Sequence, residues 1–315
     1  MNIKKIISSI GFSLFLSFFS FLSGCSTGIE GTKTITFSKS ERKEIIASGE
    51  ESFVADIKPL KLSEWKTGKR FMIADNRAAL VFELPSTLSS DSLGLQGEII
   101  TFNRLLERPT PGGSNQTVIS FTGKENEYLY PTGKNNKEAL ENMTSLDVPM
   151  IIDLDLVDLY KKKLEGMKVW TRSQLWYDEE GEKLPGRKFV PVTITEVVPG
   201  DKLFHLHLHI EDEAGRKAML YMNPMYRGLE SRTFANLFYI SDPKSRYPSI
   251  QPEVWEHICR GEVRTGMTKE ECKLSLGNPD DVNTGHDWNQ TIEIWNYKNG
   301  SFLQFQDGLL TRFRI

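Results

Sequence analysis

The chain has 315 residues, of which 39% are hydrophobic and 26% are charged, and its formal net charge is −3. That length is too great for one small domain and suits two or three. The slightly acidic balance argues against nucleic acid, or a broad anionic lipid surface, as the partner.

The first 24 residues have the pattern of a bacterial lipoprotein signal peptide. Lys4 and Lys5 precede an uncharged run at 6–22 that is rich in Phe and Leu, and the segment closes on Gly24-Cys25. A basic region, an apolar region and small residues before the cut describe an export signal. A cysteine directly after the cut completes a lipobox, which predicts that Cys25 is lipidated. An uncleaved transmembrane helix is the alternative, but the run is barely long enough and lacks basic anchors beyond it.

Export would leave a peripheral protein held by lipid on Cys25. Two or more acyl chains anchor a protein stably, and loss of Lys4 and Lys5 takes the net charge from −3 to −5. Ser26 after the cysteine resembles an outer-membrane sorting signal. We therefore expect a bacterial cell-envelope protein at the outer membrane, with the periplasmic face favoured over the surface. Residues 25–49 are mostly polar and predict a lipidated tether.

Residues 50–147 and 148–243 predict two β-rich modules. Short β-prone runs alternate with Gly, Pro and Asp turns, most clearly in residues 188–222. The succession strand, Pro-Gly turn, strand, Gly turn, aromatic-ended strand occurs twice, with Gly68–Phe71 corresponding to Gly166–Val169. Two related small barrels or half-barrels of about ninety residues each would explain this repeat. Chance punctuation of a β-rich chain is the alternative.

The run Met150–Val157 resembles the nucleophile strand of haloacid-dehalogenase-type phosphatases, which continues as Asp-x-Asp-x-Val. That chemistry needs a doubly wound parallel sheet, whereas the following sequence predicts hairpins. We therefore expect Asp153, Asp155 and Asp158 to form a solvated edge. The acidic turn at 178–182 lacks EF-hand spacing, so no catalytic residue and no cofactor is indicated.

His205, His207 and His209 alternate with apolar residues, which predicts three imidazoles on one face of a strand. Two of them could share a zinc ion, and this is the basis of a zinc-dependent hydrolase hypothesis. No Cys or Glu-x-x-His motif accompanies them. We interpret them as the solvent face of a half-buried strand, or a pH-sensitive patch, and expect no metal.

Residues 249–315 predict a separate domain of mixed α+β class. An amphipathic helix at 252–260 ends at Gly261. A capping box at Thr268–Glu271 opens a second helix, which Gly277 ends. Each helix therefore has its own stop or start signal, and we expect the segment to fold alone.

Three antiparallel strands complete the predicted domain, with hairpin turns at Asn299-Gly300 and Asp307-Gly308. The motif Gly266-Met267-Thr268…Leu276-Gly277-x-Pro279, followed by Trp295-x-Tyr297, resembles the BamE/SmpA/OmlA family. These are small lipoprotein domains of the outer-membrane β-barrel assembly machinery, and a similar unit occurs in β-lactamase inhibitor proteins. The resemblance implies two helices on a three-stranded meander and an envelope protein as partner.

Cys259 and Cys272 remain after the lipidated Cys25. An even pair in an oxidising compartment predicts a disulfide between the two helices. Closing that short loop would stabilise the domain by about 2–3 kcal/mol. Two free, buried thiols are the alternative.

These features together predict a non-enzymatic, lipid-anchored envelope protein that acts as a protein-binding scaffold or accessory factor, with outer-membrane assembly implied by the resemblance. A binding protein for cell-wall or glycan fragments is the alternative, with an aromatic stacking platform. Its residues would be Trp65, Trp170, Trp176 and Tyr177. The enzyme alternative is the zinc-dependent hydrolase centred on the histidine strand.

Overall fold

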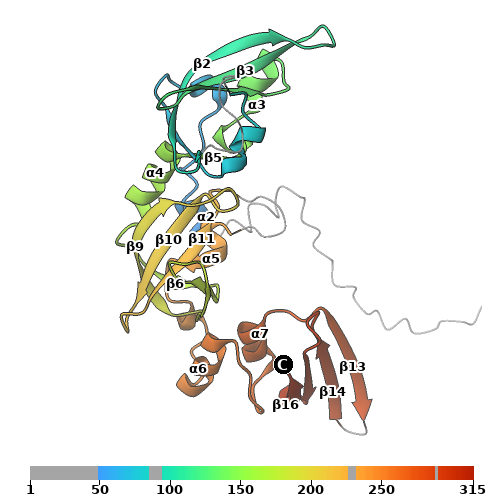
Figure 1. Ribbon diagram of the computed structural model, residues 1–315. Coiled ribbons are helices and arrows are strands. Elements are labelled where there is room, and N and C mark those ends of the chain that lie inside the picture. Colours follow the sequence, from blue (N-terminus) through green and yellow to red (C-terminus); the bar gives the residue numbers. More distant parts are fainter. Residues whose placement is uncertain (1–48, 85–93, 226–231, 288–289) are drawn as a thin grey trace, which may run out of the picture. The chain divides into compact units, whose positions relative to one another are not determined.

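The computed structural model describes residues 49–84, 94–225, 232–287 and 290–315 (Figure 1). The predicted signal peptide, Cys25 and nearly all of the tether lie outside the described residues. The described chain is a β-rich α+β protein with three antiparallel sheets, one of them a half-barrel. No helix among the described residues is both long and apolar enough to cross a membrane.

The first sheet has five strands in the order β4-β3-β2-β1-β5. Figure 1 shows β2 and β3 as a long hairpin. Large aromatic side chains, among them Trp65, Phe71 and Phe121, fill the core on one face. The strands are β1 (Arg70–Ile73), β2 (Ile99–Pro109), β3 (Asn115–Thr122), β4 (Glu127–Pro131) and β5 (Ile151–Asp153). The short helices are α3 (Asn136–Asn142), η1 (Leu62–Glu64), η2 (Asn76–Leu80) and η3 (Ser145–Asp147).

The second sheet has seven strands in the order β12-β6-β9-β10-β11-β7-β8. Helix α4 (Leu154–Leu164) turns Leu156, Val157, Tyr160 and Leu164 into the core that this sheet shares. The strands are β6 (Lys168–Thr171), β7 (Leu175–Tyr177), β8 (Lys183–Pro185), β9 (Pro191–Pro199), β10 (Leu206–Asp212), β11 (Lys217–Met222) and β12 (Phe238–Tyr239). The remaining helices here are α2 (Gly49–Phe53), α5 (Phe234–Leu237) and η4 (Pro243–Arg246).

The five-stranded arrangement of the first sheet recurs inside the second. The order β4-β3-β2-β1-β5 corresponds to β11-β10-β9-β6-β12. We call β1–β5 the first unit, and β6 with β9–β12 the second unit. The predicted repeat is therefore present as a repeat of strand order. Strand β5 completes the first sheet by pairing with β1, so that sheet continues beyond residue 147.

The register of the two units agrees as well. The N–H of Gly68 donates to Phe102 O at 2.8 Å, and the N–H of Gly166 donates to Ile194 O at 2.8 Å. One residue further along, Asn103 of β2 and Thr195 of β9 are each skipped by the pairing, as β-bulges. Bulges locally bend a strand, and both units bend at the same place.

The C-terminal segment forms helices α6 (Pro252–Arg260) and α7 (Lys269–Leu276) and a meander sheet. The Thr268–Glu271 capping box is present, and Gly261 ends α6 in the left-handed conformation. The sheet has four strands, one more than predicted: β13 (Asp281–Asp287), β14 (Gln290–Asn296), β15 (Phe302–Gln306) and β16 (Leu309–Arg314). The sequence of β13 contains Asn and Gly, which disfavour strands, but pairing along β14 overrides that preference.

Helix α6 belongs to the same buried core as the second sheet. The ring of Trp255 lies 5.7 Å from that of Phe189, centroid to centroid. The N–H of Lys188 and the side-chain amide of Gln174 both donate to Cys259 O, at 3.0 and 3.3 Å. The core is thus continuous across residue 249, where the sequence predicted the start of a separate domain.

Candidate functional site

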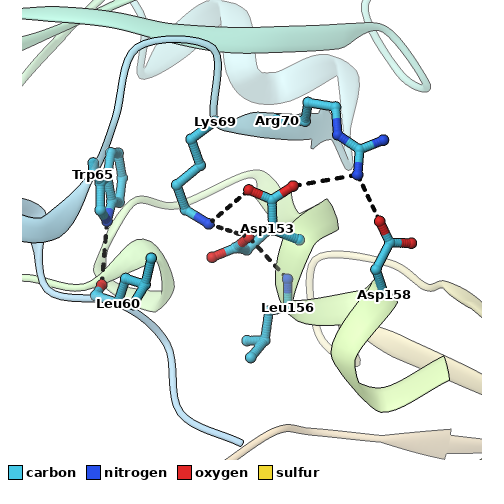
Figure 2. Close-up of polar contacts among 8 residues, drawn as sticks. Leu60, Trp65, Lys69, Arg70, Asp153, Leu156 and Asp158 are labelled. Carbon is cyan, nitrogen blue, oxygen red and sulfur yellow. Dashed lines mark hydrogen bonds and ion pairs between the residues drawn. The ribbon is translucent and has the colours of Figure 1, made fainter. Parts of the chain in front are cut away.

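A buried ion pair joins Lys69 to Asp153 in the first unit (Figure 2). Phe71 pairs directly with Asp153 across β1 and β5, so Lys69, two residues earlier, is a diagonal neighbour of Asp153 on the same face. Lys69 Nζ lies 2.6 Å from Asp153 Oδ1, and their side chains are only 5% and 2% exposed. The predicted solvated edge is therefore wrong for Asp153, because Lys69 supplies the partner that lets the carboxylate be buried.

The two carboxylate oxygens of Asp153 have different surroundings. Oδ1 accepts from Lys69 and also from the backbone N–H of Leu156 at 3.1 Å, which makes Asp153 the N-cap of α4. Oδ2 is buried and has no hydrogen-bond partner among the described residues. Most buried polar atoms in folded proteins are hydrogen-bonded, so an isolated carboxylate oxygen requires an explanation.

Asp155 and Asp158 extend this cluster to the surface, as expected for them. Asp155 Oδ2 lies 3.4 Å from Lys69 Nζ, and its Oδ1 lies 3.3 Å from Arg70 Nη2. Asp158 Oδ2 accepts from Arg70 Nη2 at 2.6 Å. That hydrogen bond raises the pKa of Arg70. Asp155 thus links a buried cation to an exposed one.

Two of the three predicted histidines lie on a strand. His205 precedes β10, whereas His207 and His209 lie on its half-exposed face. His207 Nε2 lies 3.4 Å from Asp201 Oδ2. Burial raises the pKa of Asp201, but hydrogen bonds from His207 and from backbone N–H groups outweigh it and leave the pKa lowered. No group of three or more His, Cys, Asp or Glu side chains in the described ranges is placed to hold a metal ion.

A cleft of about 690 Å³ lies beside His205, and we call it the Leu203 cleft. Leu203 and Met225 in its wall are 65% and 48% exposed. Met150 adopts a φ of 63°, the left-handed region that β-branched and bulky residues rarely occupy. The lining residues are Arg77, Tyr130, Leu146, Asp147, Val148, Pro149, Met150, Lys202, Leu203, His205, Asn223, Pro224 and Met225.

Asp75 holds two cations at this cleft. Its carboxylate accepts from Arg77 Nε at 3.0 Å and from Arg77 Nη2 at 2.9 Å, and from Lys202 Nζ at 2.5 Å. Hydrogen bonds from the backbone and side chain of Arg77 lower the pKa of Asp75. The cleft therefore combines exposed apolar side chains with a fixed group of charges.

The proposed aromatic platform is divided by the fold. Trp65 and Trp176 are buried in the two separate cores. Trp170 and Tyr177 are half-buried, and Tyr177 stacks on Tyr221 with ring centroids 4.4 Å apart. Two of the four predicted residues thus have no surface to offer a sugar ring.

Cys259 and Cys272 are both free and buried, so the predicted disulfide is absent. Burial raises the pKa of both thiols, that of Cys272 to about 12. Each helix uses its cysteine as a small apolar side chain in the shared core. An even cysteine count cannot reveal how two helices are rotated about their axes.

Sequence reasoning missed Lys69, Arg77 and Lys202 as members of charged clusters. For Lys69 a signal existed in the repeat, because Gly68-Lys69-Arg70 corresponds to Gly166-Met167-Lys168. The methionine at the matching position indicates a buried site, and a buried site is an unusual place for a lysine. No comparable signal marks the other two.

No protein-family model, curated protein or solved structure matches this sequence.

Proposed function

We propose that this protein is a non-catalytic, lipid-anchored protein of the bacterial envelope that binds another envelope protein in the Leu203 cleft. The exposed apolar wall of that cleft is the observation that carries the proposal. Its volume of about 690 Å³ is within the usual range of binding pockets.

The chemistry of the cleft fits a protein partner. Leu203 and Met225 expose large apolar side chains. Arg77 and Lys202, which line the same cleft, both form ion pairs with Asp75. An apolar centre with charged groups at its margin is the usual composition of a protein interface. Exposed apolar patches of this kind mark interaction sites more often than isolated surface leucines do.

The C-terminal segment supports an accessory role in outer-membrane assembly. Its two helices and Thr268–Glu271 capping box fit the architecture that the BamE/SmpA/OmlA resemblance implies, whereas its meander sheet has four strands in place of three. Fold likeness does not fix function. We therefore infer a protein partner from the chemistry of the cleft, and we infer the process, outer-membrane assembly, from the resemblance alone. In this proposal Cys25 carries the lipid, at the periplasmic face of the outer membrane.

Glycan binding is the weaker candidate. Only Trp170 and Tyr177 of its four aromatic residues reach the surface, and only in part. Titration of the full chain with soluble cell-wall fragments would favour this candidate if binding were lost on Tyr177→Ala and kept on Leu203→Asp.

Site-specific photo-crosslinking in cells tests the main proposal. A photoreactive residue at position 203 should give a discrete crosslinked product, and the same residue at Leu80 should not. Leu80 is 79% exposed and does not line the cleft. Leu203→Asp should abolish the product formed from position 225, whereas Leu80→Asp should leave it. Equal products from positions 203 and 80 would overturn the proposal.

A further inference from the structure

We propose that Lys69 and Asp153 join through an amide bond between Lys69 Nζ and Asp153 Cγ, formed by the folded chain itself. The bond would cross-link β1 to the end of β5 and close a loop of the chain between residues 84 positions apart. It is a modification site that goes beyond the proposed binding function and does not depend on it.

The two groups already lie in contact in a place that excludes water. Nζ and Oδ1 are 2.6 Å apart, and both side chains are at least nine-tenths buried. The Phe71 ring lies 5.3 Å from Nζ. Figure 2 shows Lys69 pointing at the carboxylate. A fixed contact of this kind replaces a chance encounter by a reaction within one molecule, which lowers the barrier.

The surroundings of Asp153 fit the product better than the ion pair. Oδ2 is buried without a partner among the described residues, and an unsatisfied buried polar atom destabilises the folded state. Amide formation removes one carboxylate oxygen, so the product has one fewer buried oxygen in need of a partner. The oxygen that remains becomes the amide oxygen and can accept from the N–H of Leu156, which already donates to this carboxyl group. Two buried charges would become one neutral amide, which also removes their desolvation cost.

The step balances without any further reagent. Transfer of one proton from the Lys69 ammonium to the Asp153 carboxylate gives a neutral amine beside a neutral acid. The nitrogen lone pair then attacks Cγ, and the C–N bond forms. Asp155 Oδ2, 3.4 Å from Nζ, accepts a second proton from the nitrogen and returns it to the hydroxyl that the first proton formed on the Asp153 carboxyl group. The C–O bond breaks and one water leaves, so nothing is oxidised or reduced.

The second unit forms the same strand order without a lysine at this position. Phe102 N–H donates to Lys69 O in the first unit, and Ile194 N–H donates to Met167 O in the second. Met167 therefore occupies the position of Lys69, and the second unit forms the same strands with it. Because methionine occupies this position in the second unit, the strand order alone does not explain a lysine in the first unit. A chemical role for Lys69 would explain it.

Tryptic digestion of the denatured full chain, followed by mass spectrometry, tests the proposal. Trypsin should fail to cut after Lys69, and one branched peptide should contain both residues, lighter than the two separate peptides by one water. Lys69→Arg keeps the charge but cannot form this amide, so it should release two ordinary peptides. The Lys163–Asp56 pair is an internal control, since its atoms lie 2.5 Å apart but Asp56 is largely exposed.

Complete cleavage after Lys69, with an unmodified Asp153 peptide, would overturn the proposal outright. A branched peptide in Lys69→Arg would assign the cross-link to another lysine and also overturn it. Asp155→Asn should leave most of the chain unlinked. Unchanged linkage in that variant would overturn the proton transfer through Asp155.

Discussion

The first and second units share strand order, register and a bulge at the same position, yet they differ in what they bury. The first unit encloses the Lys69–Asp153 pair, whereas the second has Met167 at the lysine position. The second unit instead shares its core with α4 and α6. Backbone pairing and the alternation of apolar residues are therefore enough for this topology. Buried charge is an addition to it.

Breaking the ion pair should produce the largest effect. Lys69→Ala leaves Asp153 buried without its cation, which should lower the free energy of unfolding by about 3–5 kcal/mol. Urea denaturation of the full chain measures this. Lys163→Ala is the matched control, and its change should be much smaller because its pair with Asp56 is exposed. Equal losses in the two variants would contradict a special role for burial.

Converting the first unit to the chemistry of the second should recover the part of that loss that comes from the uncompensated buried charge. The double variant Lys69→Met with Asp153→Asn removes both charges and keeps an N-cap side chain for α4. Replacing a buried ion pair by neutral residues of similar volume is often close to neutral. We expect the urea midpoint of the double variant to lie well above that of Lys69→Ala. A double variant as unstable as Lys69→Ala would mean that the first unit needs the pair to fold.

The shared core of the second unit can be tested at Trp255. This residue is 7% exposed and packs on Phe189 and Tyr247. Trp255→Ala should cost about 3–5 kcal/mol. Hydrogen exchange should show faster exchange in both β9 and α6, and unchanged protection in β2 and β3. Faster exchange confined to residues 249–315 would indicate an independent C-terminal domain, as the sequence predicted.

Much of the fold could be predicted from the sequence, because the signals were local. The Thr268–Glu271 box, the Gly261 stop and the Asp307-Gly308 hairpin each depend on a few neighbouring residues. The repeat was visible in the spacing of its turns. The β-prone runs expected within residues 188–222 are present as β9, β10 and β11.

The charged clusters could not be predicted in this way. Lys69 and Asp153 are brought together by β1 and β5, which are far apart in sequence, and Asp75 reaches Lys202 across a still longer separation. Helix α4 was missed because the apolar run before Asp153 predicts a strand that ends there. In the structure Asp153 ends β5 and is also the N-cap of α4. The disulfide failed for a similar reason, since pairing depends on helix rotation.

A smaller effect should appear in the pH dependence of stability at the second unit. Burial lowers the pKa of Lys188 to about 8, and its ammonium donates to Ser275 O at the end of α7. Between that pKa and the ordinary value of 10.5 the unfolded chain binds more protons than the folded chain at this site. Stability from this group therefore rises with pH through that window. Thermal unfolding of Lys188→Met, compared with the original chain from pH 8 to 10, should lack this rise.

The smallest effect should come from the turn that precedes β2 and β9. Gly97 and Phe189 occupy the same place, because their N–H groups donate to Ile73 O and Thr171 O, the matching ends of β1 and β6. Both have positive φ, 85° and 58°. Glycine accepts this conformation freely, whereas an L side chain pays about 1–2 kcal/mol.

Gly97→Ala should therefore lower the free energy of unfolding by about 1 kcal/mol through backbone strain alone, since no atom lies within 4 Å of the added methyl group. Phe189→Gly relieves the same strain but gives up the contact with Trp255, so its loss should be larger than that of Gly97→Ala. Urea denaturation of the two variants measures the difference. A stabilised Phe189→Gly variant would show that the packing of Phe189 on α6 contributes less free energy than the positive φ of Phe189 costs. The second unit would then carry backbone strain at this turn that its packing does not offset.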